Sequence, residues 1–451
     1  MKSIVLFFIG SVVFSLQGLS QADVQKKLQK QLILAEAGAV IELPEGVFEF
    51  TNTLSLEEKK KITIRGKGMN KTKLSFKDQT DGAEGIRVSN CDDIILEGFS
   101  VQDAKGDAIK TMHVNNITFR DVKTEWTGTP GPQNGGYGFY PVQCDGVMID
   151  QCEAMGASDA GIYVGQSKNI VVKNSKAYYN VAGIEIENSI HAEVFNNEAY
   201  QNTGGVLVFD LPDLVQKKGG DVNVHDNNIH DNNFPNFAPK GNIVASVPTG
   251  TGILILAAKG VNIYKNKIIN NQSVGTGIIS YFTTGKPIKD KLYDPYPSAI
   301  AIYDNQFERQ VGRPVSADPL GMIVSKRFKE NTPHIIYDGI KNPALLDANG
   351  NRQYDYGNSA GYTRPAGAYG GRHTIAENEF SDERFTRNVF NGRTFAEFNL
   401  YEGLKFTTNF AADIQNRMDL TYQNKIIGDG APAGRSSKSN QLLTNYTFNH
   451  K

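Results

Sequence analysis

Residues 162–183 read IYVGQSKNIVVKNSKAYYNVAG, and residues 184–205 read IEIENSIHAEVFNNEAYQNTGG. These two stretches of 22 residues align without a gap. In each of them an alternating apolar segment is followed by a polar turn, a second such segment and a third, shorter one that ends at Asn180 or Asn202. Alternation over such short segments predicts β-strands with one buried face. The repeat therefore predicts three short strands in every 22 residues.

The repeat continues, with insertions, on both sides of these two copies. Its later copies are VNVHDNNIHDNN, VNIYKNKIINN and IAIYDNQFERQ, and its earlier copies are IRVSNCDDIILEGFSVQD and HVNNITFRDV. Three short strands cannot enclose a hydrophobic core alone, but they can stack on identical neighbours. We therefore predict an all-β protein in which residues 23–345 form a right-handed, single-stranded parallel β-helix. In this solenoid Gly161, Gly183 and Gly205 should line up along one axis.

Asparagine recurs at one phase of the repeat, where it occupies Asn197, Asn227, Asn266 and Asn305. Its side chain tolerates left-handed turn geometry, and its amide can form hydrogen bonds with its counterpart in the next coil. We interpret these asparagines as a structural ladder and not as ligand-binding residues.

The three cysteines are an odd number, which excludes a complete disulfide framework. Cys91 and Cys144 share one phase of the repeat with Ser167 and Ser189, and one coil lies between the two cysteines. Coils stack about 4.8 Å apart, so these cysteines should lie roughly 10 Å apart, too far for a disulfide. A buried column of small side chains is the expected arrangement.

Two segments precede the repeats. Residues 1–22 begin with one lysine, continue with an apolar run from Ile4 to Phe14 and end in small residues, which is the pattern of a secretory signal peptide. The run is too short to span a membrane, and no later stretch is long enough to form a transmembrane helix. We therefore expect an exported protein that is periplasmic, on the outer surface or secreted. Residues 22–36 predict an amphipathic helix that caps the open end of the β-helix.

The repeat ends before residue 352, and residues 352–451 have a different pattern. Thr394–Leu400 and Leu404–Asp413 alternate over longer segments and are joined by the turn YEG, which predicts an antiparallel β-hairpin tail. The stretches GRTFAEFNLYEGLKFTTNFAADI and NKIIGDGAPAGRSSKSNQLLTNYTFNH resemble strands and a loop of TonB-dependent outer-membrane glycan receptors. The plug, the TonB box and most of the barrel are missing from this resemblance. We interpret the tail as part of a hybrid or truncated reading frame that does not fold independently, with a soluble β appendage as the alternative.

The repeat region, about residues 40–345, resembles the pectate-lyase-like superfamily of extracellular β-helix proteins. Within it, VLVFDLPDL, NFAPKGNIVASVPTGTG and IIYDGIKNP resemble an uncharacterised bacterial family of parallel β-helix repeat proteins. The stretch GGYGFYPVQCDGVMIDQC, residues 135–152, is similar to the YGFDPH pattern of alginate C5-epimerases. This chain has Tyr140 where that pattern has Asp and Val142 where it has His, so two groups that the epimerase mechanism uses are replaced.

The remaining polar residues around this stretch form the candidate catalytic site. In epimerases and related lyases a base removes the proton next to a uronate carboxylate, and a second group acts on the other face of the sugar. The resemblance implies proton transfer by Tyr137 or Tyr140, with the phenol pKa lowered by a nearby cation. Lys105 or Lys110 would neutralise the carboxylate, and Asp159 would orient the substrate or bind a metal. The alternative is that Tyr137 and Phe139 pack on a loop that the insertion TEWTGTPGPQNGG forms outside the β-helix.

A second group of candidates lies in two insertions on successive coils, at Asp210, Asp213, Asp226 and Asp231. Carboxylate oxygens are typical ligands of Ca²⁺, so these residues are candidates for a calcium site. Solvated carboxylates in turns are the alternative interpretation.

The balance of basic and acidic residues narrows the classes of molecule that we expect this protein to bind. The chain has 47 basic and 48 acidic residues, so it lacks the net positive charge that is typical of nucleic-acid-binding proteins. From the superfamily resemblance we expect a protein that binds an acidic polysaccharide and modifies it by β-elimination or C5-epimerisation. The alternative is a non-catalytic carbohydrate-binding or surface scaffold protein. Ca²⁺ is the only cofactor that these patterns indicate.

Overall fold

The computed structural model describes residues 21–309, 314, 319–340 and 342, and the backbone of residues 382–401, 404–423 and 435–450. The chain divides into two compact units, Met1–Gly371 and Arg372–Lys451. Most of the predicted signal peptide falls on residues 1–20, which lie outside the described residues. Among the described residues, no helix is long and apolar enough to cross a membrane.

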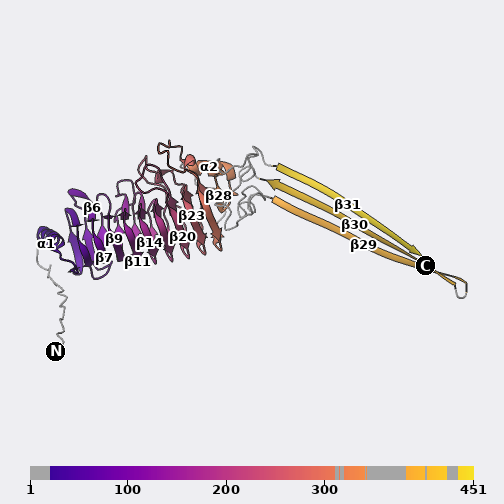
Figure 1. The fold of residues 1–451 in the computed structure, drawn as a ribbon, viewed down its shortest axis with the longest axis horizontal. Coiled ribbons are helices and arrows are strands. Elements are labelled where there is room, and N and C mark those ends of the chain that lie inside the picture. Colours follow the sequence, from indigo (N-terminus) through magenta and orange to yellow (C-terminus); the bar gives the residue numbers. More distant parts are fainter. Residues whose placement is uncertain are drawn as a thin grey trace, which may run out of the picture. The chain divides into compact units, whose positions relative to one another are not determined.

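The first unit is a stack of parallel coils that begins with helix α1 (Gln21–Leu34) (Figure 1). One of its sheets has ten parallel strands: β3 (Asn52–Glu57), β6 (Asp81–Ser89), β8 (Ile109–Met112), β10 (Tyr137–Val142), β13 (Ala160–Gly165), β16 (Ala182–Glu187), β19 (Gly204–Phe209), β22 (Thr251–Leu256), β25 (Val274–Ile279) and β28 (Ile335–Tyr337).

The other strands of the first unit form an eighteen-stranded parallel sheet. These strands are β1 (Val40–Glu42), β2 (Gly46–Glu49), β4 (Lys60–Arg65), β5 (Thr72–Ser75), β7 (Asp92–Gln102), β9 (Asn115–Glu125), β11 (Asp145–Asp150), β12 (Glu153–Met155), β14 (Lys168–Lys173), β15 (Lys176–Tyr178), β17 (Ile190–Phe195), β18 (Glu198–Tyr200), β20 (Gly220–His225), β21 (Asn228–His230), β23 (Lys259–Tyr264), β24 (Lys267–Ile269), β26 (Ser298–Tyr303) and β27 (Gln306–Glu308). Short helices η1 (Val244–Ser246), η2 (Tyr281–Thr284) and α2 (Pro319–Phe328) lie in the insertions and near the last coil.

Successive copies of the repeat pair in parallel with matching phase, as the sequence predicts. Ile162 pairs with Ile184, which pairs with Val206, so that the intervening Gly161, Gly183 and Gly205 line up. The apolar side chains at these paired positions point inward and are fully buried. The predicted right-handed parallel β-helix is therefore confirmed.

The predicted asparagine ladder is present. The side-chain oxygen of Asn227 accepts hydrogen bonds from the backbone and side-chain nitrogens of Asn197, at 2.9 and 3.1 Å. Asn266 and Asn305 continue the same pattern. The expected left-handed backbone, however, belongs to the residue before each ladder asparagine, such as Asn196 with φ 54°. The ladder residue itself can then direct its amide into the core.

A second ladder, which the sequence pattern did not reveal to us, joins Asn180, Asn202, Asn232 and Asn271. Glycine lies beside this ladder because there is no room for a side chain. A Cβ on Gly183 would lie 2.6 Å from the carbonyl oxygen of Gly205 and 2.8 Å from the side-chain nitrogen of Asn202. The aligned glycines thus allow the coils to approach closely.

The three cysteines are free and buried, in agreement with the expected column of small side chains. The backbone nitrogen of Cys144 donates to the hydroxyl of Ser167, and the nitrogen of Ser167 donates to the hydroxyl of Ser189, both at 3.0 Å. Small polar side chains at this phase therefore link one coil to the next.

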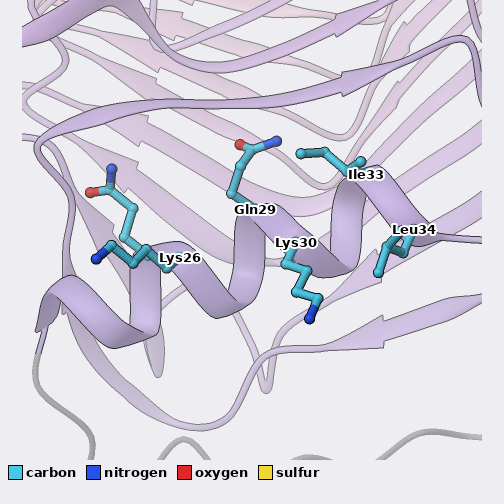
Figure 2. Close-up of a pocket in the computed structure, with 6 residues that line it drawn as sticks. Lys26, Gln29, Lys30, Ile33 and Leu34 are labelled. Atoms are coloured by element: carbon cyan, nitrogen blue, oxygen red, sulfur yellow. The ribbon is translucent and has the colours of Figure 1, made fainter.

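Helix α1 covers the first coil, as predicted for a cap. The amide of Gln29 accepts a hydrogen bond from the backbone nitrogen of Ser55 and donates one to its carbonyl oxygen, both at 2.9 Å. Gln29 thereby satisfies polar groups at the edge of β3 that a further strand would otherwise bind. The outer side of α1 borders a hollow of about 360 Å³. Figure 2 shows side chains that line it, among them Gln29, Lys30 and Ile33.

The second unit contains a three-stranded antiparallel sheet of β29 (Asp382–Tyr401), β30 (Leu404–Gln423) and β31 (Arg435–His450). Tyr401 of β29 pairs with Leu404 of β30. The predicted antiparallel hairpin tail is therefore confirmed, with a third strand added.

Candidate functional site

The outer face of the ten-stranded sheet carries the candidate site. Strand residues alternate between the core and this face, and the outward positions of successive strands form columns. One column contains Arg87, Lys110 and Tyr140, which are paired directly in the register of β6, β8 and β10. It continues through Tyr163, Glu185 and Leu207 of β13, β16 and β19.

This face is open on one side of the site and covered on the other. Arg87 is exposed, and Lys110 and Tyr140 are half-buried, whereas Tyr163 and every outward residue named after it are buried. We call residues 231–250 the covering segment, because its Val244 and Val247 belong to the apolar cluster over the outer face. That cluster also contains Tyr163, Leu207 and Leu254. The site lies where the open face meets this cover.

Three tyrosines form an aromatic cluster at this boundary. The rings of Tyr137 and Tyr140 stack with their centroids 4.4 Å apart. Tyr163 lies 4.6 Å from Tyr137 and 5.0 Å from Tyr140. The structure thus brings together the two tyrosines that the sequence indicated and adds a third from the next coil.

The two candidate lysines differ in their surroundings. The ammonium of Lys110 lies 4.9 Å from the ring centre of Tyr140, 3.7 Å from the carboxylate of Asp107 and 3.8 Å from that of Glu84. Lys105 is exposed, and its backbone nitrogen donates to the side chain of Gln79. Of the two, only Lys110 is placed beside a candidate tyrosine.

Asp107 lies beside Lys110 and was not among the sequence candidates. Burial raises its pKa to about 6, against the opposing effect of Lys110. A Cβ on Gly136 would lie 3.6 Å from a carboxylate oxygen of Asp107 and 4.0 Å from the Cβ of Asp159. The glycine-rich stretch before β10 therefore leaves room for two carboxyl groups.

Asp159 lies under the covering segment. Its carboxyl group accepts a hydrogen bond of 2.8 Å from the side-chain nitrogen of Asn242 and another from the hydroxyl of Tyr137. Burial raises its pKa to about 7, although both hydrogen bonds act in the opposite direction. Asp159 is therefore placed to hold Tyr137 in position.

Two further carboxyl groups, on β16, lie beside the tyrosines; Glu185 is buried and Glu187 is half-buried. Glu187 accepts a hydrogen bond of 2.7 Å from the hydroxyl of Tyr163, and burial raises its pKa to about 7. The pKa of Glu185 is raised well above its ordinary value by burial and by the proximity of Glu187 and Asp159. One carboxyl oxygen of Glu185 has no hydrogen-bond partner in the described structure. Alignment of the two ungapped repeats, which places Tyr163 over Glu185, could have identified this residue.

The prediction that a nearby cation lowers the phenol pKa of Tyr137 or Tyr140 is wrong. Burial and, after it, nearby carboxylates with Asp107 first together raise the pKa of Tyr140 to about 12. Burial also raises the pKa of Tyr137 well above its ordinary value. Acidic neighbours outnumber Lys110 here, so both phenols are held in their neutral form.

The four aspartates proposed for calcium lie in different surroundings. Asp210 is buried after β19, where it accepts a hydrogen bond of 2.9 Å from the backbone of Gly219. Asp213 is exposed in the following loop. Asp226 and Asp231 follow β20 and β21 of the other sheet and lie beside histidines. Among the described residues, no group of three or more acidic, histidine or cysteine side chains is arranged to hold a metal, so the structure does not assemble this calcium site.

Arg87 is a further residue that the sequence reasoning missed. It is exposed on the open face next to Lys110, and among the described contacts it makes no ion pair. Its alternation with the buried Ile86 and Val88 was the available signal, because that pattern points Arg87 outward.

Comparisons with solved structures give distant similarities. The A-module of mannuronan C-5 epimerase AlgE4 from Azotobacter vinelandii shares 16% identity with this chain, over 64% of this chain and 84% of that one, with a TM-score of 0.44. The exopolygalacturonase from Thermotoga maritima shares 13% identity, over 64% and 76%, with a TM-score of 0.39. Similarities this distant do not inform the site. No curated protein sequence matches the chain significantly.

One family does match this chain over a long range. The family described as "Right handed beta helix region" matches residues 61–213 and 132–289, which together cover just over half of the chain. The match includes the aligned coils, both asparagine ladders up to Asn271 and the tyrosine cluster. The chain therefore belongs to the right-handed β-helix family.

Proposed function

We propose that this protein is exported, binds an acidic polysaccharide on the open outer face of the ten-stranded sheet, and modifies it by β-elimination or C5-epimerisation. The observation that carries the proposal is the position of Lys110, between the carboxylate of Asp107 at 3.7 Å and the ring of Tyr140 at 4.9 Å. A base, a cation and a neutral phenol thus lie together on a partly exposed surface.

The open face supports binding of a chain of acidic sugars. Arg87 and Lys110 occupy one outward column, on strands about 4.8 Å apart. An arginine can bind a carboxylate through two parallel hydrogen bonds, and Arg87 is exposed for such a contact. Lys110 is already near two carboxylates, so we assign the main contact with a uronate to Arg87 and a supporting role to Lys110.

The pKa values favour a carboxylate base and a phenol acid. The pKa of Asp107, about 6, leaves most of this group ionised at neutral pH, so it can accept the proton next to the uronate carboxylate. The pKa of Tyr140, about 12, keeps the phenol protonated. In elimination the phenol proton goes to the leaving glycosidic oxygen as the carbon–oxygen bond breaks. In epimerisation it goes to the opposite face of the same carbon. Tyr140 is therefore assigned as the acid, with Tyr137 and Asp159 holding its ring in place.

A non-catalytic carbohydrate-binding or surface scaffold is the second candidate function. It is favoured by the cover over β13 to β25, which keeps Asp159 and Tyr163 away from solvent. The open column that begins at Arg87 would serve as the binding surface in this case also. Only a test for product distinguishes the two functions.

The test is an incubation with alginate, pectate and glycosaminoglycans. Elimination gives an unsaturated uronate that absorbs ultraviolet light, and epimerisation changes the proton NMR spectrum of the polymer. Asp107→Asn and Tyr140→Phe should each lower turnover by about 100-fold or more. Lys168→Gln, at an exposed lysine on the other sheet, is the control and should retain turnover. Binding by the wild-type protein without any product would support the scaffold function instead.

A further inference from the structure

The outward column of the ten-stranded sheet remains polar for two strands under the cover. Tyr163 and Glu185 follow Tyr140 in this column, and only from Leu207 and Leu254 onward is it apolar. Both polar residues are nevertheless buried, at 4% and 2% exposure. A leucine at position 185 would suit a permanently covered surface better.

The burial of Glu185 is not fully compensated by hydrogen bonds in the described structure. One of its carboxyl oxygens lacks a hydrogen-bond partner in the described structure. Burying a carboxyl group without its full set of hydrogen bonds costs free energy. Such a group persists where a different state of the protein uses it. The neighbouring Glu187, also outward on β16, has one partner, the hydroxyl of Tyr163.

Internal hydrogen bonds give the covering segment its shape, but few polar contacts join its middle to the rest of the molecule. The side chain of Asn236 binds the carbonyl oxygens of Val244 and Val247 within the segment, at 2.9 and 3.0 Å. The two ends of the segment, residues 231–234 and 248–250, are hydrogen-bonded to the coils. Between these ends, one described bond joins the segment to the sheet below, from Asn242 to Asp159. A second joins it to the neighbouring insertion, from Lys286 to the carbonyl oxygen of Gly241 at 2.9 Å. Apart from these two described bonds, the middle of the segment packs on the sheet through apolar side chains such as Val244 and Val247.

The contact between the covering segment and the sheet below it is close, but it involves small groups. A Cβ on Gly204 would lie 3.1 Å from a methyl group of Val247. Val247 thus rests on the start of β19, and Gly250, with a φ of 87° that favours glycine, ends the segment. The middle of the segment, residues 235–247, is tied to its surroundings by only two described hydrogen bonds over an apolar surface, so it can separate from that surface while the anchored ends and the coils stay in place.

We propose that the covering segment is a lid that opens above Tyr163, Glu185 and Glu187, and that these residues then extend the polysaccharide-binding face beyond Tyr140. The inference rests on the proposed function for the identity of the ligand. The two carboxyl groups supply donors and acceptors for sugar hydroxyls, and the ring of Tyr163 supplies an apolar surface beside them. With the lid closed, the face accepts only the part of the chain that lies over β6, β8 and β10.

The opening is tested without a ligand by chemical labelling of carboxyl groups with a carbodiimide and an amine, followed by mass spectrometry. In Asn242→Ala the labelling of Glu185 and Glu187 should be about five- to tenfold faster than in the wild type, because one hydrogen bond is lost. Lys286→Met, which removes the other tether, should act in the same direction. The matched control is Asn262→Ala, which removes a 2.8 Å bond between two asparagines on the other sheet and should not alter this labelling.

The extended face is tested with short and long oligomers of alginate and pectate. Long oligomers should bind Asn242→Ala more tightly than they bind the wild type, whereas short oligomers should bind both equally. Long oligomers should also protect Glu185 and Glu187 from labelling in the variant. Equal labelling of these residues in the wild type and in both tether variants overturns the lid. Faster labelling without binding of any oligomer leaves the lid in place and contradicts the proposed function.

Discussion

Replacing Asp159 by asparagine should remove the contribution of this residue to the pH dependence of the stability of the first unit. Burial raises the pKa of Asp159 from 3.8 to about 7. Between these two values the unfolded chain is ionised at this residue while the folded chain is still protonated. The stability that the protonated group contributes is therefore fully present below about pH 4 and is lost as the pH rises through about 7.

The size of the effect follows from the same numbers. The folded and unfolded pKa values of Asp159 differ by about three units. This difference corresponds to about 4 kcal/mol of stability, because one pKa unit is worth about 1.4 kcal/mol. Asparagine has no such titration. It can still accept the hydrogen bond from Asn242, but it loses the one from Tyr137, at a cost of about 1 kcal/mol. The variant should be less stable than the wild type by about 1 kcal/mol at pH 4 and more stable by about 3 kcal/mol at pH 8.

The assay is urea unfolding of both proteins at pH 4 and pH 8, followed by circular dichroism. Asp145→Asn, at an exposed aspartate on the other sheet, serves as the control and should follow the wild type at both pH values. If the difference between Asp159→Asn and the wild type has the same sign and size at both pH values, the assigned burial of this carboxyl group is wrong.

Three further outcomes are expected. The double variant Tyr137→Phe with Tyr140→Phe should lose any turnover on uronate polymers and keep its circular dichroism spectrum; undiminished turnover would remove these residues from the site. Lys110→Gln should weaken turnover at least tenfold, whereas Lys105→Gln should leave it unchanged because that side chain is exposed; equal losses would contradict this distinction. Asn227→Ala should lower the free energy of unfolding by about 2–3 kcal/mol, measured by urea titration, because it leaves the buried backbone nitrogen of Asn197 without its partner. A change below about 0.5 kcal/mol would show that the ladder does not contribute as described.

The coils could be predicted from the sequence because the residues that form each coil are close together in the chain and recur in every copy. Each copy places apolar residues at the same positions, so the ungapped pair at residues 162–205 fixes both the period and the inward face. The Asn197 ladder followed from the same spacing. The second ladder was missed although Asn202, Asn232 and Asn271 have the same spacing as Asn197, Asn227 and Asn266, so its signal was present in the sequence as well.

The site could be predicted only in part, because its electrostatics depend on residues distant in the sequence. Tyr137 and Tyr140 were visible as an unusual aromatic pair at the start of a coil. Their pKa values were not, because burial and several carboxyl groups from other coils determine the direction of the shift. The cover over Asp159 comes from Asn242, 83 residues later, in a segment that has no repeat pattern. Without that segment, Glu185 would be read as an ordinary exposed residue.

The side-chain amide of Gln29 helps to close the N-terminal end of the β-helix. Every coil in this architecture presents the same donors and acceptors to the next one, so nothing in the repeat itself limits how many coils, or how many molecules, can join. By occupying both the nitrogen and the oxygen of Ser55, one helical glutamine takes the place that a foreign strand would need. The boundary between a monomer of finite length and an end-to-end fibre therefore depends, on this side, on helix α1 and on the hydrogen bonds that Gln29 makes from it.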